Sequence, residues 1–121
     1  MAYALVMTPE VRAWLHELRH RNRPSAIQVG QAIGLLLEAG PELGRPLADR
    51  IQHSRLINLK ELRPGSAGRS EIRILYIFDP RRNAVLLVAG DKAGKWEAWY
   101  RQAIPLAEQR YEDYLKSEGT G

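Results

Sequence analysis

The sequence contains no cysteine, which excludes disulfide scaffolds, thiolate zinc sites, iron–sulfur clusters and cysteine nucleophiles. It has no apolar run near the roughly 18 residues needed to cross a bilayer. Residues 1–7 have neither a basic start nor a cleavage site for export. We therefore expect a cytoplasmic protein with no membrane partner.

The chain has 121 residues, of which 45% are hydrophobic and 26% charged, an ordinary globular composition. This length predicts one domain over residues 1–121, with a polar tail at 117–121. The net charge is +4, and the surplus lies in the middle, where residues 55–95 carry 9 Lys and Arg against 4 Asp and Glu. A basic centre favours an anionic partner.

The first half of the sequence predicts a strand followed by two helices. Residues 3–7 are apolar and β-prone, and Thr8 and Pro9 then form an N-cap and a first-turn proline. Ser25 and Gln28 predict a capping box for the second helix, which Gly40-Pro41 ends. Residues 40–50 are predicted to be a loop.

The second half predicts three strands and a helix. The apolar periodicity changes to two, which indicates strands at 55–63 and 69–79, and the unbroken apolar run at 84–89 indicates an interior strand. A helix is expected over 94–116, kinked or split at Pro105. The order is βααβββα, an α+β domain with a small mixed sheet packed by helices.

Charged side chains recur at odd positions near the turn between the first two of these strands. Because side chains alternate along a strand and antiparallel strands pair across a turn, these residues should cluster at one end of one sheet face. The alternative is a solvated hairpin end with compensating salt bridges. The residues are Glu61, Arg63, Arg69, Glu71 and Arg73.

The segment 90–95, between the last strand and the last helix, contains two glycines and two lysines. Backbone N–H groups, a helix N-terminus and ammonium groups can together bind a phosphate. The spacing does not fit a Walker A loop, because three residues separate Gly90 and Gly94 and Trp96 replaces the required Ser or Thr. If the last strand neighbours the hairpin, Lys92 and Lys95 could face Arg73.

The sequence indicates no metal or cofactor site. His16 and His20 lie one helical turn apart, but no third ligand is evident, and a solvated helix face explains them better. The tryptophans and tyrosines of the last helix are expected mainly in the core rather than in a base-stacking surface.

Four segments, in this order, carry a family resemblance. They are residues 59–63 (LKELR), residues 71–76 (EIRILY), the apolar strand running into Gly90-Asp91-Lys92, and residues 107–114 (AEQRYEDY). Over nearly its whole length the chain resembles the RelE/ParE superfamily of bacterial type II toxins, most closely its HigB-like, phage-related branch. The resemblance implies a RelE-like fold.

This resemblance implies a toxin that acts as an mRNA interferase, an endoribonuclease that cuts mRNA in the ribosomal A site and so inhibits translation. Its partners would be the ribosome, mRNA and an antitoxin, usually a helix-turn-helix protein. The same superfamily includes ParE proteins, so a DNA gyrase inhibitor is one alternative. A protein of this fold that has lost catalysis and serves as an antitoxin-binding co-repressor is the other.

The resemblance also implies positions for the site. Arg73 falls where relatives keep an arginine on the third strand, and Lys92 with Lys95 where relatives place basic groups. Glu61 and Arg63 fall on the preceding strand. The aromatic residue that stacks on a base is Tyr100 or, alternatively, Trp96 or Trp99.

RNA cleavage by the 2′-hydroxyl needs a proton acceptor, a proton donor for the leaving oxygen and positive charge on the phosphorane, and it needs no metal. Glu61 is the expected base, and Lys92 or Lys95 the donor or a second electrostatic stabiliser. Arg73 and Arg63 are expected to grip the phosphate, because a guanidinium can bind two oxygens at once. The residues expected to bind RNA are Lys60, Arg69, Trp96 and Tyr100.

Overall fold

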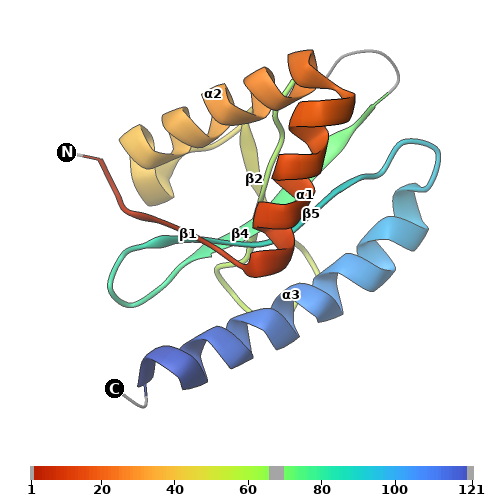
Figure 1. Cartoon of the computed structure of the whole chain (residues 1–121). Coiled ribbons are helices and arrows are strands. Elements are labelled where there is room, and N and C mark those ends of the chain that lie inside the picture. The colour runs from red at the N-terminus through yellow and green to blue at the C-terminus, as the bar shows by residue number, and fades with distance from the viewer. Residues whose placement is uncertain (1, 66–69, 120–121) are drawn as a thin grey trace.

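A mixed sheet of five strands lies at the centre of the computed structural model, which describes residues 2–65 and 70–119 (Figure 1). The strand order is β1-β5-β4-β3-β2; β1 and β5 are parallel, and the other neighbours are antiparallel. The predicted α+β fold is confirmed. The strands are β1 (Leu5–Met7), β2 (Ala48–Arg50), β3 (Lys60–Leu62), β4 (Ile72–Phe78) and β5 (Ala84–Asp91).

The helices lie on both faces of this sheet. Figure 1 shows α1 and α2 on one side and α3 running across the other. None of the helices in the described part of the chain is both long and apolar enough to span a membrane. The helices are α1 (Pro9–Arg21), α2 (Arg23–Ala39), the 3-10 helix η1 (Gly40–Glu42) and α3 (Trp96–Gly119).

Alternation along β4 divides the core into two layers. Ile72, Ile74 and Tyr76, at every second position of β4, pack under α1 and α2. Leu75 and Ile77 pack on the opposite side against α3. The central strands are therefore apolar on both faces, and charge is tolerated only where a strand reaches the end of the sheet.

The helix caps follow local chemistry. The Thr8 hydroxyl accepts a hydrogen bond from the Val11 N–H at 3.2 Å, as predicted for the start of α1. The predicted capping box on Ser25 and Gln28 is wrong: Asn22 caps α2 by accepting from the Ser25 N–H at 3.3 Å. Asn22 also ends α1 through its own N–H, so one residue serves both helices.

Two strand predictions need correction. Residues 55–63 form a strand only over β3, and the predicted loop at 40–50 contains η1 and β2. The segment between β2 and β3 leaves the sheet because α3 binds it: Glu108 accepts hydrogen bonds from the Ser54 hydroxyl at 2.8 Å and the Arg55 N–H at 2.9 Å. These tertiary contacts outweigh the local β pattern.

The last helix begins two residues later and ends three residues later than the predicted 94–116. It is not split at Pro105, and it continues through residues 117–119, which the sequence had placed in a tail. The remaining tail residues, 120–121, lie outside the described residues.

Asp79, in the turn between β4 and β5, fastens that turn to α3. Its buried carboxylate accepts from Asn83 N–H at 2.8 Å, Asn83 Nδ2 at 3.1 Å and the Tyr114 hydroxyl at 2.6 Å. Burial by itself would raise the pKa of Asp79, but these hydrogen bonds, Tyr114 foremost, hold that pKa below its ordinary value. The Asp79 interaction with Tyr114 also contributes to raising the pKa of Tyr114, behind burial, to about 12.

We predict that Asp79→Ala lowers the free energy of unfolding at pH 7 by about 2–3 kcal/mol, since charged hydrogen bonds are lost and buried donors are left unpaired. Folding lowers the pKa of Asp79. The extra stability that this carboxylate gives the wild-type protein is therefore fully present above the ordinary carboxyl pKa, and it is lost as the pH falls through the pKa of Asp79 in the folded protein. Urea denaturation across pH measures this. Asp113→Ala, on exposed α3 surface, is the matched control and should change stability by less than about 0.5 kcal/mol; equal effects would contradict the assignment.

Candidate active site

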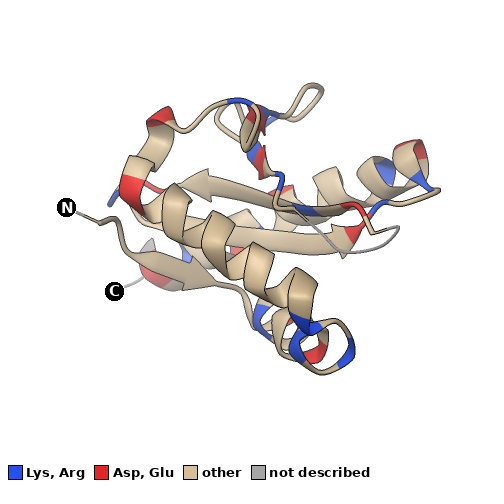
Figure 2. Ribbon diagram, turned by 90° about the horizontal axis from the view of Figure 1, so that it is seen from above, with Lys and Arg blue, Asp and Glu red and all other residues tan. Residues whose placement is uncertain are grey.

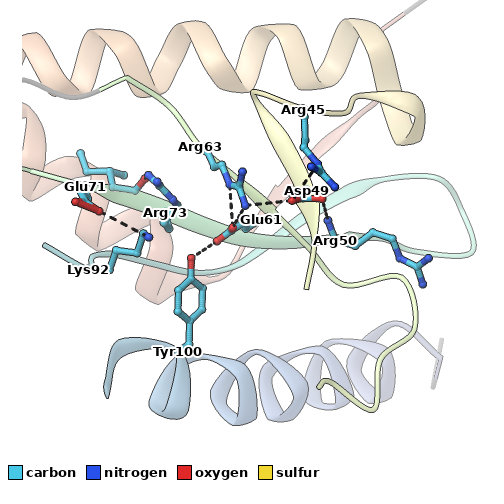
Figure 3. Close-up of polar contacts among 10 residues, drawn as sticks. Arg45, Asp49, Arg50, Glu61, Arg63, Glu71, Arg73, Lys92 and Tyr100 are labelled. Carbon is cyan, nitrogen blue, oxygen red and sulfur yellow. Dashed lines mark hydrogen bonds and ion pairs between the residues drawn. The ribbon is translucent and has the colours of Figure 1, made fainter. Parts of the chain in front are cut away.

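Charged side chains from β2, β3 and β4 and from residues next to the strands meet the Tyr100 and Trp96 side chains of α3, at the end of the sheet where α3 begins (Figure 3). Glu61 on β3 pairs with Leu75, and Arg73, two residues earlier on β4, pairs with Gly90. Glu61 and Arg73 therefore lie on neighbouring strands and on the face that α3 covers. Figure 2 shows acidic and basic residues interspersed over the molecule, whereas α2 has no charge between Arg23 and Glu38.

An irregularity in β5 brings Lys92 to the same face. Leu75 pairs with Val88 while the next residue of β4, Tyr76, pairs with Leu86, so Leu87 is an extra residue. After such a bulge the alternation of side chains is reversed. Leu87 and Val88 both pack on the α3 side, and Lys92, which without the extra residue would lie under α1 and α2, lies on the α3 side as well.

Glu61 is the centre of a hydrogen-bonded chain across the cluster. It is 4% exposed, and its Oε1 accepts from the Tyr100 hydroxyl at 2.5 Å. Its Oε2 lies 2.8 Å from Arg63 Nη2, which in turn lies 3.2 Å from Asp49 Oδ2. The order Tyr100–Glu61–Arg63–Asp49 holds the buried carboxylate in one orientation.

The pKa shifts of Tyr100, Arg63 and Asp49 follow from their contacts. Burial raises the pKa of Tyr100, and the hydrogen bond to Glu61 raises it further, so the phenol stays protonated at neutral pH. Burial by itself would lower the pKa of Arg63, but its contacts with Glu61 and Asp49 outweigh burial and raise it. The backbone N–H of Arg50 is the main cause that lowers the pKa of Asp49.

Lys92 is buried beneath aromatic rings. It is 2% exposed, and its Nζ lies 3.0 Å from the centre of the Trp96 ring and 3.7 Å from Glu71 Oε2. Trp96 donates from Nε1 to the same Glu71 oxygen at 3.2 Å. Burial lowers the pKa of Lys92, and the charge of Arg73 lowers it further, which makes this lysine a better acid than an exposed one.

Arg73 has hydrogen-bonding capacity left over. Its Nη1 donates to the Ile72 carbonyl at 2.7 Å. Its Nε is buried and has no acceptor among the residues that the structure describes. A buried donor without an acceptor is costly, and an anion at this point would satisfy it.

Other residues predicted from the sequence lie elsewhere. Lys60 is on the opposite face of the sheet, where its Nζ donates to the carbonyls of Pro41 and Leu43 at 3.1 and 2.7 Å. Lys95 is exposed, and its side chain forms no hydrogen bond or ion pair within residues 2–65 and 70–119. Arg69 lies outside the described residues. Trp96 is 58% exposed, so it is not a core residue.

Sequence reasoning missed Asp49 as a member of the cluster. It was assigned to a loop, and only the pairing of β2 with β3 places Asp49 opposite Glu61. Nothing in the sequence near Asp49 indicates which residue it would face, so a local pattern could not have placed it in the cluster. Glu71 was predicted in the charged group, but its contacts with Lys92 and Trp96 depend on the bulge in β5 and the start of α3.

A groove of about 560 Å³ opens beside this cluster, between the segment after β2 and the first half of α3. Glu61, Trp96 and Tyr100 line it together with Ile51, His53 and Ile104. The cluster thus has access to solvent along one side. Within the described part of the chain, no group of three or more His, Cys, Asp or Glu could hold a metal ion.

We predict that Arg63→Met lowers the free energy of unfolding by about 2 kcal/mol, because it leaves Glu61 buried without its cation. Adding Glu61→Gln should restore part of that loss, since the amide carries no charge. Arg45→Met is the matched control: Arg45 also pairs with Asp49 but is 78% exposed, and the expected loss is under about 0.5 kcal/mol. Chemical denaturation measures all three variants, and a loss at Arg63 no larger than at Arg45 would contradict the role assigned to Arg63.

Comparison with known proteins gives a consistent picture. Over 118 residues the chain is 49% identical to a Mycobacterium tuberculosis protein named "Putative toxin HigB3", and the match covers 98% of each chain. It is also 49% identical over 105 residues to "Putative toxin HigB2" of the same organism. This match covers 87% of this chain but only about half (51%) of that relative. No solved structure matches significantly.

A family profile agrees with these relatives. Residues 13–112, which include every member of the cluster, match the family described as phage-derived protein Gp49-like. The resemblance to HigB-like, phage-related toxins is thereby confirmed, and the chain belongs to the Gp49-like family.

Proposed function

We propose that this protein is the toxin of a type II toxin–antitoxin system and acts as a ribosome-dependent mRNA endonuclease that inhibits translation. The observation that carries the proposal is the convergence of Glu61, Tyr100, Arg73 and Lys92 at one end of the sheet, beside an open groove. This set contains a proton acceptor (Glu61 with Tyr100), a proton donor (Lys92) and a fixed cation (Arg73), which metal-independent RNA cleavage requires.

The first step is attack of a 2′-hydroxyl on the adjacent phosphorus. The Tyr100 hydroxyl already donates to Glu61, so the phenol oxygen can accept the 2′ proton while passing its own to the carboxylate. The new O2′–P bond closes a cyclic phosphate. Arg63, predicted as a phosphate clamp, already binds Glu61 and Asp49, and we assign it the role of orienting Glu61.

The second half of the reaction breaks the P–O5′ bond. Arg73 offers its unpaired Nε to a phosphate oxygen and balances the charge that develops on the phosphorane. The Lys92 ammonium transfers a proton to the departing O5′, which leaves a 5′-hydroxyl, and exchange with solvent then returns Glu61 and Lys92 to their starting states. Lys95, exposed outside the cluster, has no place in this sequence.

An antitoxin is the expected protein partner, and a helix-turn-helix protein is the kind we propose. An acidic segment placed over Arg73 and Lys92, or steric cover of the groove, would keep RNA away.

We predict that Lys92→Met reduces message cleavage on ribosomes by about 10²–10⁴-fold, the usual contribution of a general acid. The measurement is mapping of mRNA 5′ ends in a translating extract, with circular dichroism to show that the variant folds. Lys116→Ala, at the far end of α3, removes a cation without approaching the cluster and should cut normally. Halted translation with intact message, or failure of DNA supercoiling instead, would contradict the nuclease assignment and favour one of the two alternatives.

The pH dependence supplies a separate prediction. An acid loses activity as the pH rises through its pKa, and the pKa of Lys92 is lowered by burial and by Arg73. We therefore expect the cleavage rate to fall on the alkaline side at a pH below the ordinary lysine value of 10.5. Lys92→Arg should remove this limb, because arginine stays protonated. An unchanged profile in Lys92→Arg would exclude Lys92 as the donor.

A further inference from the structure

The outer face of α2 is uncharged over most of its length and carries large apolar side chains. Ile27 and Leu35 on this face are 53% and 49% exposed. Between them lie three further exposed residues without charge, Gly30, Gln31 and Gly34. Exposed apolar side chains grouped on one surface indicate a place where another molecule binds.

This face points away from the candidate active site. α2 packs on the sheet beside α1, whereas α3 and the groove lie on the other side of the sheet (Figure 1). Residues three or four positions apart share one side of a helix. Four exposed residues of α2 have this spacing and therefore form its outer face: Ile27, Gln31, Gly34 and Glu38. A partner bound there leaves the charged cluster and the groove open.

The two ends of the face carry opposite charges. Arg23 is the first residue of α2, Glu38 is the last but one, and both are exposed. Neither side chain forms an ion pair with another of the described residues. A matching partner therefore needs an apolar centre, a negative end beside Arg23 and a positive end beside Glu38. The α2 helix of a second copy, running antiparallel, has this pattern.

The spacing of these residues also matches in such a pair. If Arg23 of one copy lies opposite Glu38 of the other, Ile27 lies opposite Gly34, because both pairs have the same midpoint along the helix. Gln31 then lies beside the two-fold axis, where its amide can donate to and accept from its own counterpart. The axis repeats each contact, so one register forms two ion pairs and two apolar contacts.

Gly34 provides the space that this register requires. A Cβ at Gly34 would meet open space among the described residues, apart from the backbone of α2 itself. Crowding within the chain therefore does not explain the glycine, which is less favourable than alanine inside a helix. In the antiparallel pair, Ile27 of the second copy fills the space above Gly34.

We propose that this protein forms a two-fold symmetric dimer through the outer face of α2, with a second copy of the chain as the partner. A contact between two 17-residue helices is small beside the roughly 1,200–2,000 Å² of stable complexes, so we expect a dissociation constant on the order of 10–100 µM. The dimer goes beyond the proposed nuclease function and does not depend on it, because the cluster lies on the other side of the sheet.

The first experiment is sedimentation equilibrium of the purified chain over a range of concentrations. The average mass should rise from one chain towards two in the wild type. Gly34→Leu should weaken the dimer at least about tenfold, because the new side chain occupies the space for Ile27. Gly44→Leu is the matched control: it adds the same apolar side chain at an exposed glycine outside α2 and should leave the dimer unchanged. Stronger association of Gly34→Leu would indicate non-specific adhesion and overturn the proposal.

The second experiment exchanges the end charges. Arg23→Glu and Glu38→Arg should each weaken the dimer about fivefold, because like charges then face each other at both ends. The double variant should regain the wild-type dissociation constant, since the opposite charges have changed places. A double variant as weak as the single ones would contradict the antiparallel register.

Two further results would overturn the dimer. One is a wild-type chain that keeps the mass of a single copy up to about 1 mM, well above the expected dissociation constant. The other is a monomeric chain in which Gly34→Leu weakens binding of the antitoxin, which would assign this face to that protein instead. Loss of message cleavage has no bearing on either measurement, so the dimer and the nuclease are tested separately.

Discussion

The pairing of β4 with β5, including its one extra residue, is the constraint on which the rest of the structure depends. These two strands are covered on both faces, so their alternation separates the α1–α2 layer from the α3 layer. The bulge at Leu87 reverses that alternation in the last part of β5. An apolar strand can therefore fill both layers along most of its length and still direct Lys92 towards Tyr100 at its end.

Charge is tolerated in this cluster because cations and anions alternate. A buried lysine or glutamate without a partner would lose its hydration and gain no interaction to compensate for that loss. Lys92 instead has Glu71 and the Trp96 ring, and Glu61 has Arg63 and Tyr100. Arg73 is the exception, since its Nε has no acceptor among the described residues. A set that is balanced apart from one donor is prepared for an anion.

Much of this arrangement could be predicted from patterns in the sequence. The period of two around residues 72–78 identified both faces of β4, and the charged odd positions indicated the end of the sheet at which the cluster forms. Lys60 shows the limit of such reasoning: it neighbours Glu61 in sequence, yet alternation places it on the other face, bound to carbonyls near η1. The capping prediction failed at Ser25 because Asn22, three residues earlier, offered an equally good cap.

By itself, the sequence determined most of the helices and strands, the apolar faces of the central strands and the types of charged group near the turn, because these depend on side-chain periodicity and local hydrogen bonding. The tertiary structure decided which charges meet. Asp49 joins the cluster through the pairing of β2 with β3, and Lys92 joins it through the bulge. The groove beside the cluster is formed by contacts of Glu108 with residues far away in the chain. Such contacts depend on strand register and on packing between distant segments, and neither leaves a periodic trace in the sequence.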